Sequence, residues 1–176
     1  MSKSKFTVQQ LTLGAMVAAI YVVLGYFGNI FSLTFGPIQF RFAEALTVLP
    51  FLFPSTVPGL FIGCLITNLL SPYGPLDIVV GSLATLLAAL WTSRLGHKWL
   101  APLPPVICNT VLVGFTIAFA ETGFTDALPA AWAYNGLTVG IGELGACYVL
   151  GMLLLYVLPR VKYFHSMIPE RRLSAV

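Results

Sequence analysis

The sequence predicts an all-helical integral membrane protein, a compact bundle of six transmembrane helices with both termini in the cytoplasm. Hydrophobic residues make up 58% of the 176 residues and charged residues only 9%, whereas a soluble domain carries about 25% charged residues. The apolar residues fall into six runs separated by short polar or proline-rich segments, and most basic residues lie at the ends of these runs. This composition excludes a disordered chain and a basic nucleic-acid-binding protein, and it argues against a water-soluble enzyme.

The six runs have the length that a bilayer requires, with one exception. A helix needs about 20 residues to cross a hydrocarbon core of about 30 Å. The first run is too long for a signal peptide and no cleavage site follows it, so we expect a transmembrane helix there. The third run reaches only about 21 Å, which favours a tilted helix and leaves five crossings plus a re-entrant segment as an alternative. The expected spans are residues 8–28, 40–53, 57–70, 76–97, 105–121 and 131–158, in one transmembrane domain with a basic cytoplasmic tail at 159–176.

The basic residues orient the bundle. With six spans, eight of the nine lysines and arginines fall on one side, which the positive-inside rule makes the cytoplasm. Arg41 is the exception. It lies three residues before Glu44 near the outer end of the second span, with Gln39 just before it. A charge at membrane depth costs several kcal/mol, so these side chains either form an ion pair with each other or line a ligand pocket.

Glu143 is the strongest candidate for a functional group. It lies eleven residues beyond Trp132, about 16 Å along the helix and therefore near the middle of the bilayer. Small residues share its face, so we expect it to point into the bundle, either as a hydrogen-bonded glutamic acid or as a ligand- or proton-handling carboxylate. These small residues are Gly136, Gly140, Cys147 and Gly151.

Three further polar residues lie in or at the ends of the spans. Asp77 begins the fourth span, where the helix dipole favours a negative charge, but it also starts a stripe of small residues. Asn68 and Asn109 either join helices or belong to a ligand site. Together these residues predict a polar chamber toward the external side.

Motifs for catalysis, cofactors or metals are missing from the sequence. It has no phosphate-binding Gly-rich loop and no nucleophile-and-base motif, and both histidines are expected on the cytoplasmic side, His97 at the end of the fourth span and His165 in the tail. The three cysteines, Cys64, Cys108 and Cys147, are scattered and do not have metal-ligand spacing. We therefore expect no enzyme activity, no cofactor and no metal.

The first span carries small residues at spacings of four. Ala15 and Ala19 form one such pair, and Gly14 and Ala18 form another. This flat surface suits close helix contact, either within the chain or with another membrane protein.

Four long segments carry a resemblance to a known family. They read "FGPIQFRFAEALTVLPF", "PGLFIGCLITNLLSPYGPLDIVVGSLATLLAA", "KWLAPLPPVICNTVLVG" and "GELGACYVLGMLLLY". From about residue 11 to 158 the chain resembles the QueT family of queuosine-precursor transporters, the substrate-binding S components of energy-coupling factor (ECF) transporters. The resemblance implies a six-helix bundle of the S-component type in the plasma membrane of a bacterial cell.

The resemblance also implies partners and a mechanism. S components bind a vitamin-like solute at the external face and work with a coupling transmembrane subunit and two cytoplasmic ATPase subunits, which drive reorientation and inward release. Ala15 and Ala19 match the docking motif of the family, and the loops at 28–37, 71–75 and 122–129 correspond to its gating loops.

The expected solute is a 7-deazaguanine, namely the 7-cyano or 7-aminomethyl compound or queuine. Glu143 or Glu44 would then accept hydrogen bonds from the guanine-like edge, and Asp77 would complement a cationic substituent. Arg41 would pair with Glu44. Other candidates are Asn68, Asn109 and Gln39 for the carbonyl edge, and Trp132, Tyr134 and Phe35 for stacking.

Two other functions remain open. A proton-coupled carrier would use Glu143 or Glu44 as a relay, and a membrane scaffold would transport nothing. An S component for another vitamin is a further alternative to the deazaguanine assignment.

Overall fold

The computed structural model describes residues 7–34 and 39–173, and all regular secondary structure in this part is helical. Four helices in that part are long and apolar enough to cross a membrane, namely Val8–Ile30, Pro75–Thr92, Lys98–Thr122 and Leu128–Arg160. The all-helical membrane class is therefore confirmed, while six crossings and the orientation of the termini remain predictions.

The first helix, α1 (Val8–Ile30), packs against α2 (Val57–Asn68). A capping box begins α1: Thr7 Oγ1 accepts from the Gln10 backbone N–H at 3.3 Å, and Gln10 Oε1 accepts from the Thr7 N–H at 3.1 Å. A Cβ atom at position 59 would lie 2.1 Å from the Gly14 carbonyl oxygen. Glycine at position 59 therefore lets the two helices approach to backbone contact.

The second apolar run forms a 3₁₀ helix, Phe42–Phe51, where the sequence suggested an α-helical span with Arg41 and Glu44 on one face. Arg41 precedes this helix in an extended conformation, and Pro50 lies inside it. Residues 43–51 are all buried. This segment therefore lies in the interior of the bundle.

The middle helices contain a widened turn. After α3 (Pro75–Thr92), the chain turns at 93–97, so the helix ends before the expected limit of 97. It then forms α4 (Leu103–Cys108), a π-helical turn (Asn109–Val113) and α5 (Gly114–Thr122), which together make one long helix.

The last long helix has the same construction. It consists of α6 (Leu128–Leu144), a π-helical segment (Gly145–Gly151) and α7 (Met152–Val157), and it continues to Arg160. The short helices α8 (Lys162–His165) and α9 (Glu170–Leu173) follow.

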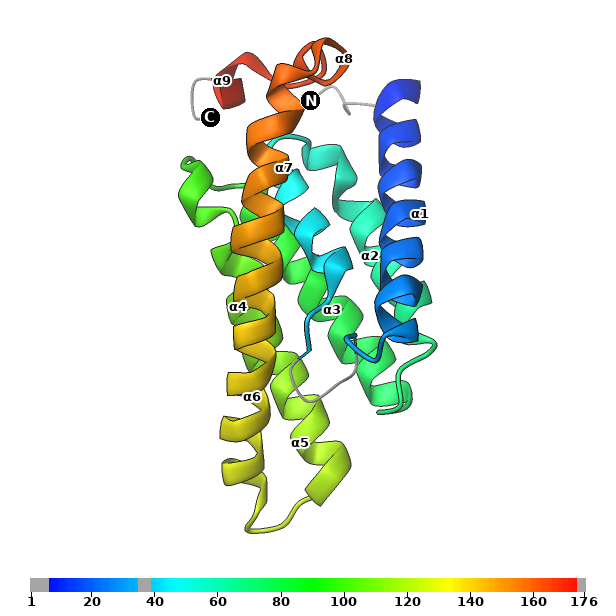
Figure 1. Cartoon of the computed structure of the whole chain (residues 1–176), viewed down its shortest axis with the longest axis vertical. Helices are drawn as coiled ribbons and strands as arrows, with labels where there is room; N and C mark the ends of the chain where they lie inside the picture. The colour runs from blue at the N-terminus through cyan, green and yellow to red at the C-terminus, as the bar shows by residue number, and fades with distance from the viewer. Residues whose placement is uncertain (1–6, 35–38, 174–176) are drawn as a thin grey trace, which may run out of the picture.

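Figure 1 shows how these helices are arranged. The long helix α6–α7 and helix α1 stand on opposite sides, with the 3₁₀ segment Phe42–Phe51 between them, and α5 and α6 extend beyond the far end of α1. The start of α1 lies at the same end of the bundle as α8 and α9.

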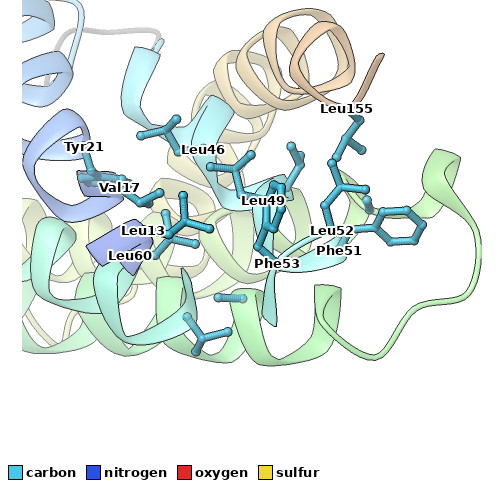
Figure 2. Packing of buried hydrophobic residues seen from close by; sticks show 14 of the residues in the cluster. Leu13, Val17, Tyr21, Leu46, Leu49, Phe51, Leu52, Phe53, Leu60 and Leu155 are labelled. Carbon is cyan, nitrogen blue, oxygen red and sulfur yellow. The ribbon is translucent and has the colours of Figure 1, made fainter. Parts of the chain in front are cut away.

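The hydrophobic core surrounds the central 3₁₀ segment. Leu46, Leu49 and Phe51 of this segment pack between Val17 of α1 and Leu155 of α7 (Figure 2). The central position of the segment carries Glu44 into the interior as well, because Glu44 lies within the same buried run.

Candidate ligand-binding site

Two buried carboxylic acids lie in one hydrogen-bonded group at the centre of the bundle. The Tyr21 hydroxyl donates a short hydrogen bond to Glu44 Oε1, and Asn109 Nδ2 donates to Glu143 Oε1 at 2.8 Å. Cys147 Sγ lies 3.5 Å from both the Glu44 carbonyl oxygen and Glu143 Oε2, which connects the two halves. We call these five residues, Tyr21, Glu44, Asn109, Glu143 and Cys147, the carboxylate cluster.

A second polar group lies where the 3₁₀ segment meets α2 and α3. Arg41 Nη2 lies 3.9 Å from Asp77 Oδ2, which also accepts from Ser71 Oγ at 2.5 Å. Asn68 Nδ2 donates to the Asp77 carbonyl oxygen at 3.3 Å. We call these four residues, Arg41, Asn68, Ser71 and Asp77, the arginine cluster.

The carboxylate that pairs with Arg41 in the described part of the chain is Asp77, where the sequence suggested Glu44. The reason is local backbone geometry. Arg41 is extended and the helix begins after it, so the rule that residues three apart share a helical face does not apply to Arg41 and Glu44. Glu44 accepts its hydrogen bond from Tyr21 of α1.

Widened helical turns accompany the carboxylate cluster. Asn109 begins the π-helical turn Asn109–Val113, and Glu143 lies two residues before the π-helical segment Gly145–Gly151. Such turns are rare in proteins and frequent at functional sites.

Glycines make room for the polar side chains. A Cβ atom at position 142 would lie 2.1 Å from the Gln39 carbonyl oxygen, so Gly142 allows the chain entering the 3₁₀ segment to rest directly on α6. A Cβ atom at position 81 would lie 2.7 Å from Asn68 Nδ2, so Gly81 leaves space for that side chain on α3.

Several buried polar atoms of the two clusters and of Gln39 beside them lack a hydrogen bond to the described residues. Four buried acceptor oxygens have no hydrogen bond to any described residue, namely Glu44 Oε2, Asn68 Oδ1, Asp77 Oδ1 and Asn109 Oδ1. A buried oxygen without a donor costs about 1–3 kcal/mol, so a ligand, an ordered water or an ion usually supplies its partner.

Acidic side chains outnumber basic ones in the buried interior of the described part of the chain. The charged side chains buried in the described part of the chain are one arginine and three carboxylic acids, Arg41, Glu44, Asp77 and Glu143. A site with this composition suits a ligand that is rich in N–H groups or positively charged.

The structure places most of the candidate residues of the sequence in these clusters. Glu143, Glu44 and Asn109 belong to the carboxylate cluster, and Arg41, Asp77 and Asn68 to the arginine cluster. Gln39 is buried beside Tyr73, close to the start of the 3₁₀ segment.

The aromatic candidates lie elsewhere. Tyr134 is 65% exposed on α6. Trp132 is 40% exposed, and its indole N–H donates to the Val111 carbonyl oxygen at 3.0 Å. The structure does not bring either ring to the clusters, and Phe35 lies outside the described residues.

Tyr21 is the main site residue that the sequence reasoning missed. Its signal is present, since Val17, Tyr21, Gly25 and Gly28 recur at spacings of four, four and three on the buried face of α1. A tyrosine on a stripe that is otherwise apolar or small needs a hydrogen-bond partner when it is buried.

The opposite face of α1 holds the expected docking residues. Ala15 and Ala19 are both exposed, and Ala15 lines a shallow groove of about 180 Å³ together with Pro58, Gly59 and Ile62 of α2.

A helical bundle whose described part has four helices long and apolar enough to cross a membrane, and a buried polar centre, has the architecture of a multi-pass membrane protein that handles a small solute. Sequence comparison assigns the family. Residues 11–160 match the family described as QueT transporter, so the chain belongs to that family and is a transporter, which is not a class of enzyme.

A curated relative agrees with this assignment. The chain is 40% identical over 134 residues to the queuosine precursor transporter QueT of Lactococcus lactis subsp. cremoris (strain MG1363), an alignment that covers 73% of this chain and 75% of the relative. No solved structure matches the chain.

Proposed function

We propose that this transporter is the substrate-binding S component of an ECF-type importer, and that it captures a 7-deazaguanine precursor of queuosine in the plasma membrane of a bacterium. The Lactococcus relative, a queuosine precursor transporter, supports the solute class. The observation in this chain that carries the proposal is the set of buried acceptor oxygens around Glu44, Asn109 and Glu143.

The chemistry of the solute matches these acceptors. The guanine-like edge of a 7-deazaguanine presents a ring N–H and an exocyclic amine side by side, and a carboxylate accepts two such donors. Glu44 Oε2 and Asn109 Oδ1 both lack a donor from the described residues, and Glu143 is hydrogen-bonded to Asn109. We assign the guanine-like edge to this carboxylate cluster.

The arginine cluster would meet the substituent on the five-membered ring. Asp77 Oδ1 and Asn68 Oδ1 lack donors among the described residues, while Arg41 already lies 3.9 Å from Asp77 Oδ2. An aminomethyl group would supply both a positive charge and N–H donors to these oxygens.

The proposal includes six crossings with both termini in the cytoplasm. The four long helices would supply four of these crossings, and the two short segments Phe42–Phe51 and Val57–Asn68 would supply the other two. The start of α1 and the helices α8 and α9 lie at one end of the bundle, as an even number of crossings requires (Figure 1).

The exposed Ala15–Ala19 face of α1 would dock the coupling transmembrane subunit, and two ATPase subunits would supply the energy. Small side chains allow a partner helix to approach closely. The groove between α1 and α2 beside Ala15 is a concave surface for such a helix.

A binding titration tests the proposal. The full chain, purified in detergent, is titrated by calorimetry with queuine, the 7-aminomethyl and 7-cyano compounds, and guanine. We expect saturable binding of at least one deazaguanine with higher affinity than guanine. If no deazaguanine binds saturably, the substrate assignment is wrong.

A further inference from the structure

A basic pocket lies at the end of the bundle where α8 and α9 are found. Its volume is about 620 Å³, and its lining includes Arg94 and His97 from the turn after α3 and Arg171 and Arg172 from α9. None of the lining residues in the described part of the chain is acidic. Two segments far apart in the sequence therefore build one positively charged concavity.

Arg172 gives this pocket a fixed shape. Its guanidinium donates short hydrogen bonds to the carbonyl oxygens of Ser93 and Leu95 and lies 5.4 Å from the centre of the Phe51 ring. Burial, and then the charge of Arg171, lowers the pKa of Arg172 from its ordinary value. Arg94, Arg171 and Arg172 together place three positive charges around the pocket.

An apolar stripe leads to the pocket along α3. Leu83, Leu87 and Trp91 are 45%, 52% and 43% exposed. Arg94 follows in the turn after α3, where its backbone N–H donates to the Trp91 carbonyl oxygen at 2.9 Å. The same face continues toward the start of α3 with Leu76 and Val79, which are 38% and 56% exposed. Its half next to the pocket, from Leu83 to Trp91, measures about 12 Å, close to one leaflet of a hydrocarbon core of about 30 Å. Trp91 ends this half, where an interfacial aromatic residue is expected.

We propose that this pocket binds the headgroup phosphate of an anionic phospholipid whose acyl chain lies along the Leu83–Leu87–Trp91 face of α3. The pocket supplies the charge complement and the stripe supplies the apolar contact. An acidic segment of a protein partner would use the charge but would have no use for the apolar stripe. The inference does not depend on which solute the transporter carries.

Native mass spectrometry of the full chain tests the inference. The protein is titrated with phosphatidylglycerol and with phosphatidylcholine of the same acyl chains. We expect phosphatidylglycerol to bind at least about tenfold more tightly, because the basic side chains that line the pocket attract an anionic headgroup. Equal affinity for the two lipids would overturn the proposal.

Two double variants distinguish lipid binding in the pocket from nonspecific attraction between the basic end of the protein and an anionic lipid. Arg94→Gln with Arg171→Gln removes two charges that line the pocket, and Arg160→Gln with Lys162→Gln removes two charges at the same end that do not line it. We expect the first variant to lose the preference for phosphatidylglycerol and the second to keep it. Equal losses would mean diffuse attraction and would overturn the assigned site.

Three controls complete the test. If the pocket double variant does not fold, the single variant Arg94→Gln serves instead, because this side chain is exposed. Displacement of the lipid by millimolar inorganic phosphate would make free phosphate the ligand and overturn the lipid assignment. Unchanged lipid binding together with lost assembly with partner subunits would instead make the pocket a protein-docking site.

Discussion

At the scale of single residues, the carboxylate cluster depends on contacts between side chains far apart in the sequence. Glu44 meets Tyr21 of α1, and Glu143 meets Asn109 across two long helices. Each of these contacts satisfies one carboxylate oxygen, and Glu44 Oε2 has no donor from the described residues. Single substitutions can therefore distinguish the hydrogen bonds that stabilise the bundle from the groups that would bind a ligand.

Glu143→Gln should lower the affinity for the deazaguanine about tenfold or more, because a charge-assisted hydrogen bond contributes about 1.5–3 kcal/mol. The glutamine retains an acceptor for Asn109 Nδ2 and the size of the side chain, so the thermal stability should change little. Calorimetric titration measures the affinity. The matched control is Glu121→Gln, which alters a carboxylate bound to Asn135 at 2.8 Å outside both clusters. Equal affinities for the two variants would reduce Glu143 to a packing group.

Tyr21→Phe removes the hydroxyl that donates to Glu44. The free energy of unfolding should fall by about 1–3 kcal/mol, since a buried carboxylate oxygen loses its donor. Denaturant unfolding in detergent measures this loss, with the exposed Tyr134→Phe as the control. If both tyrosine variants unfold at the same denaturant concentration as the original protein, the Tyr21–Glu44 bond contributes nothing to stability.

At the scale of helices and segments, close backbone contact positions the site. The chain entering the 3₁₀ segment rests on α6 at Gly142, and α1 rests on α2 at Gly14 and Gly59. These contacts hold the unusual second segment at the centre of the bundle, and the segment in turn carries Glu44.

Gly142→Ala should destabilise the protein by about 1–3 kcal/mol, the usual cost of overpacking, because the new Cβ would lie 2.1 Å from the Gln39 carbonyl oxygen. The displacement would also move Gln39 and Arg41, so ligand affinity should fall with stability. Thermal unfolding and calorimetric titration measure the two effects. Gly96→Ala is the control, because a Cβ atom there meets nothing within 4 Å.

Ala15→Trp should abolish assembly with the coupling subunit and leave ligand binding intact, because the large ring would fill the groove between α1 and α2. Co-purification with the coupling subunit measures assembly. Met16→Trp, an exposed position on the same turn, is the control. Loss of both assembly and ligand binding in the Ala15 variant would indicate misfolding and would not support a docking face.

At the scale of the whole molecule, the energy source distinguishes the proposed importer from a proton-coupled carrier. In membrane vesicles, uptake of the deazaguanine should require the ATPase subunits and ATP and should persist after the proton gradient is collapsed. Uptake that continues without the ATPase subunits and stops with the proton gradient would favour the carrier, with the two buried glutamic acids as its relay.

The fold class was predictable because composition and helix periodicity report local properties of the chain. A chain with 9% charged residues cannot cover a bundle with polar surface, and the small residues around Glu143 showed that its face is buried. The same reasoning identified Asp77, which is buried as its small-residue stripe suggested. The second segment was not predictable in the same way, since its apolar residues fit an α-helix and a 3₁₀ helix equally well.

The sequence by itself determined that this protein is a helical membrane protein and which few charged residues lie inside it, because both follow from the cost of placing charge in an apolar environment. Only the tertiary structure decided which of those residues meet. Arg41 pairs with Asp77, and Glu44 pairs with Tyr21, because an extended residue before a central 3₁₀ helix directs the two side chains to different helices. Such pairings depend on packing between distant segments, which no local pattern encodes.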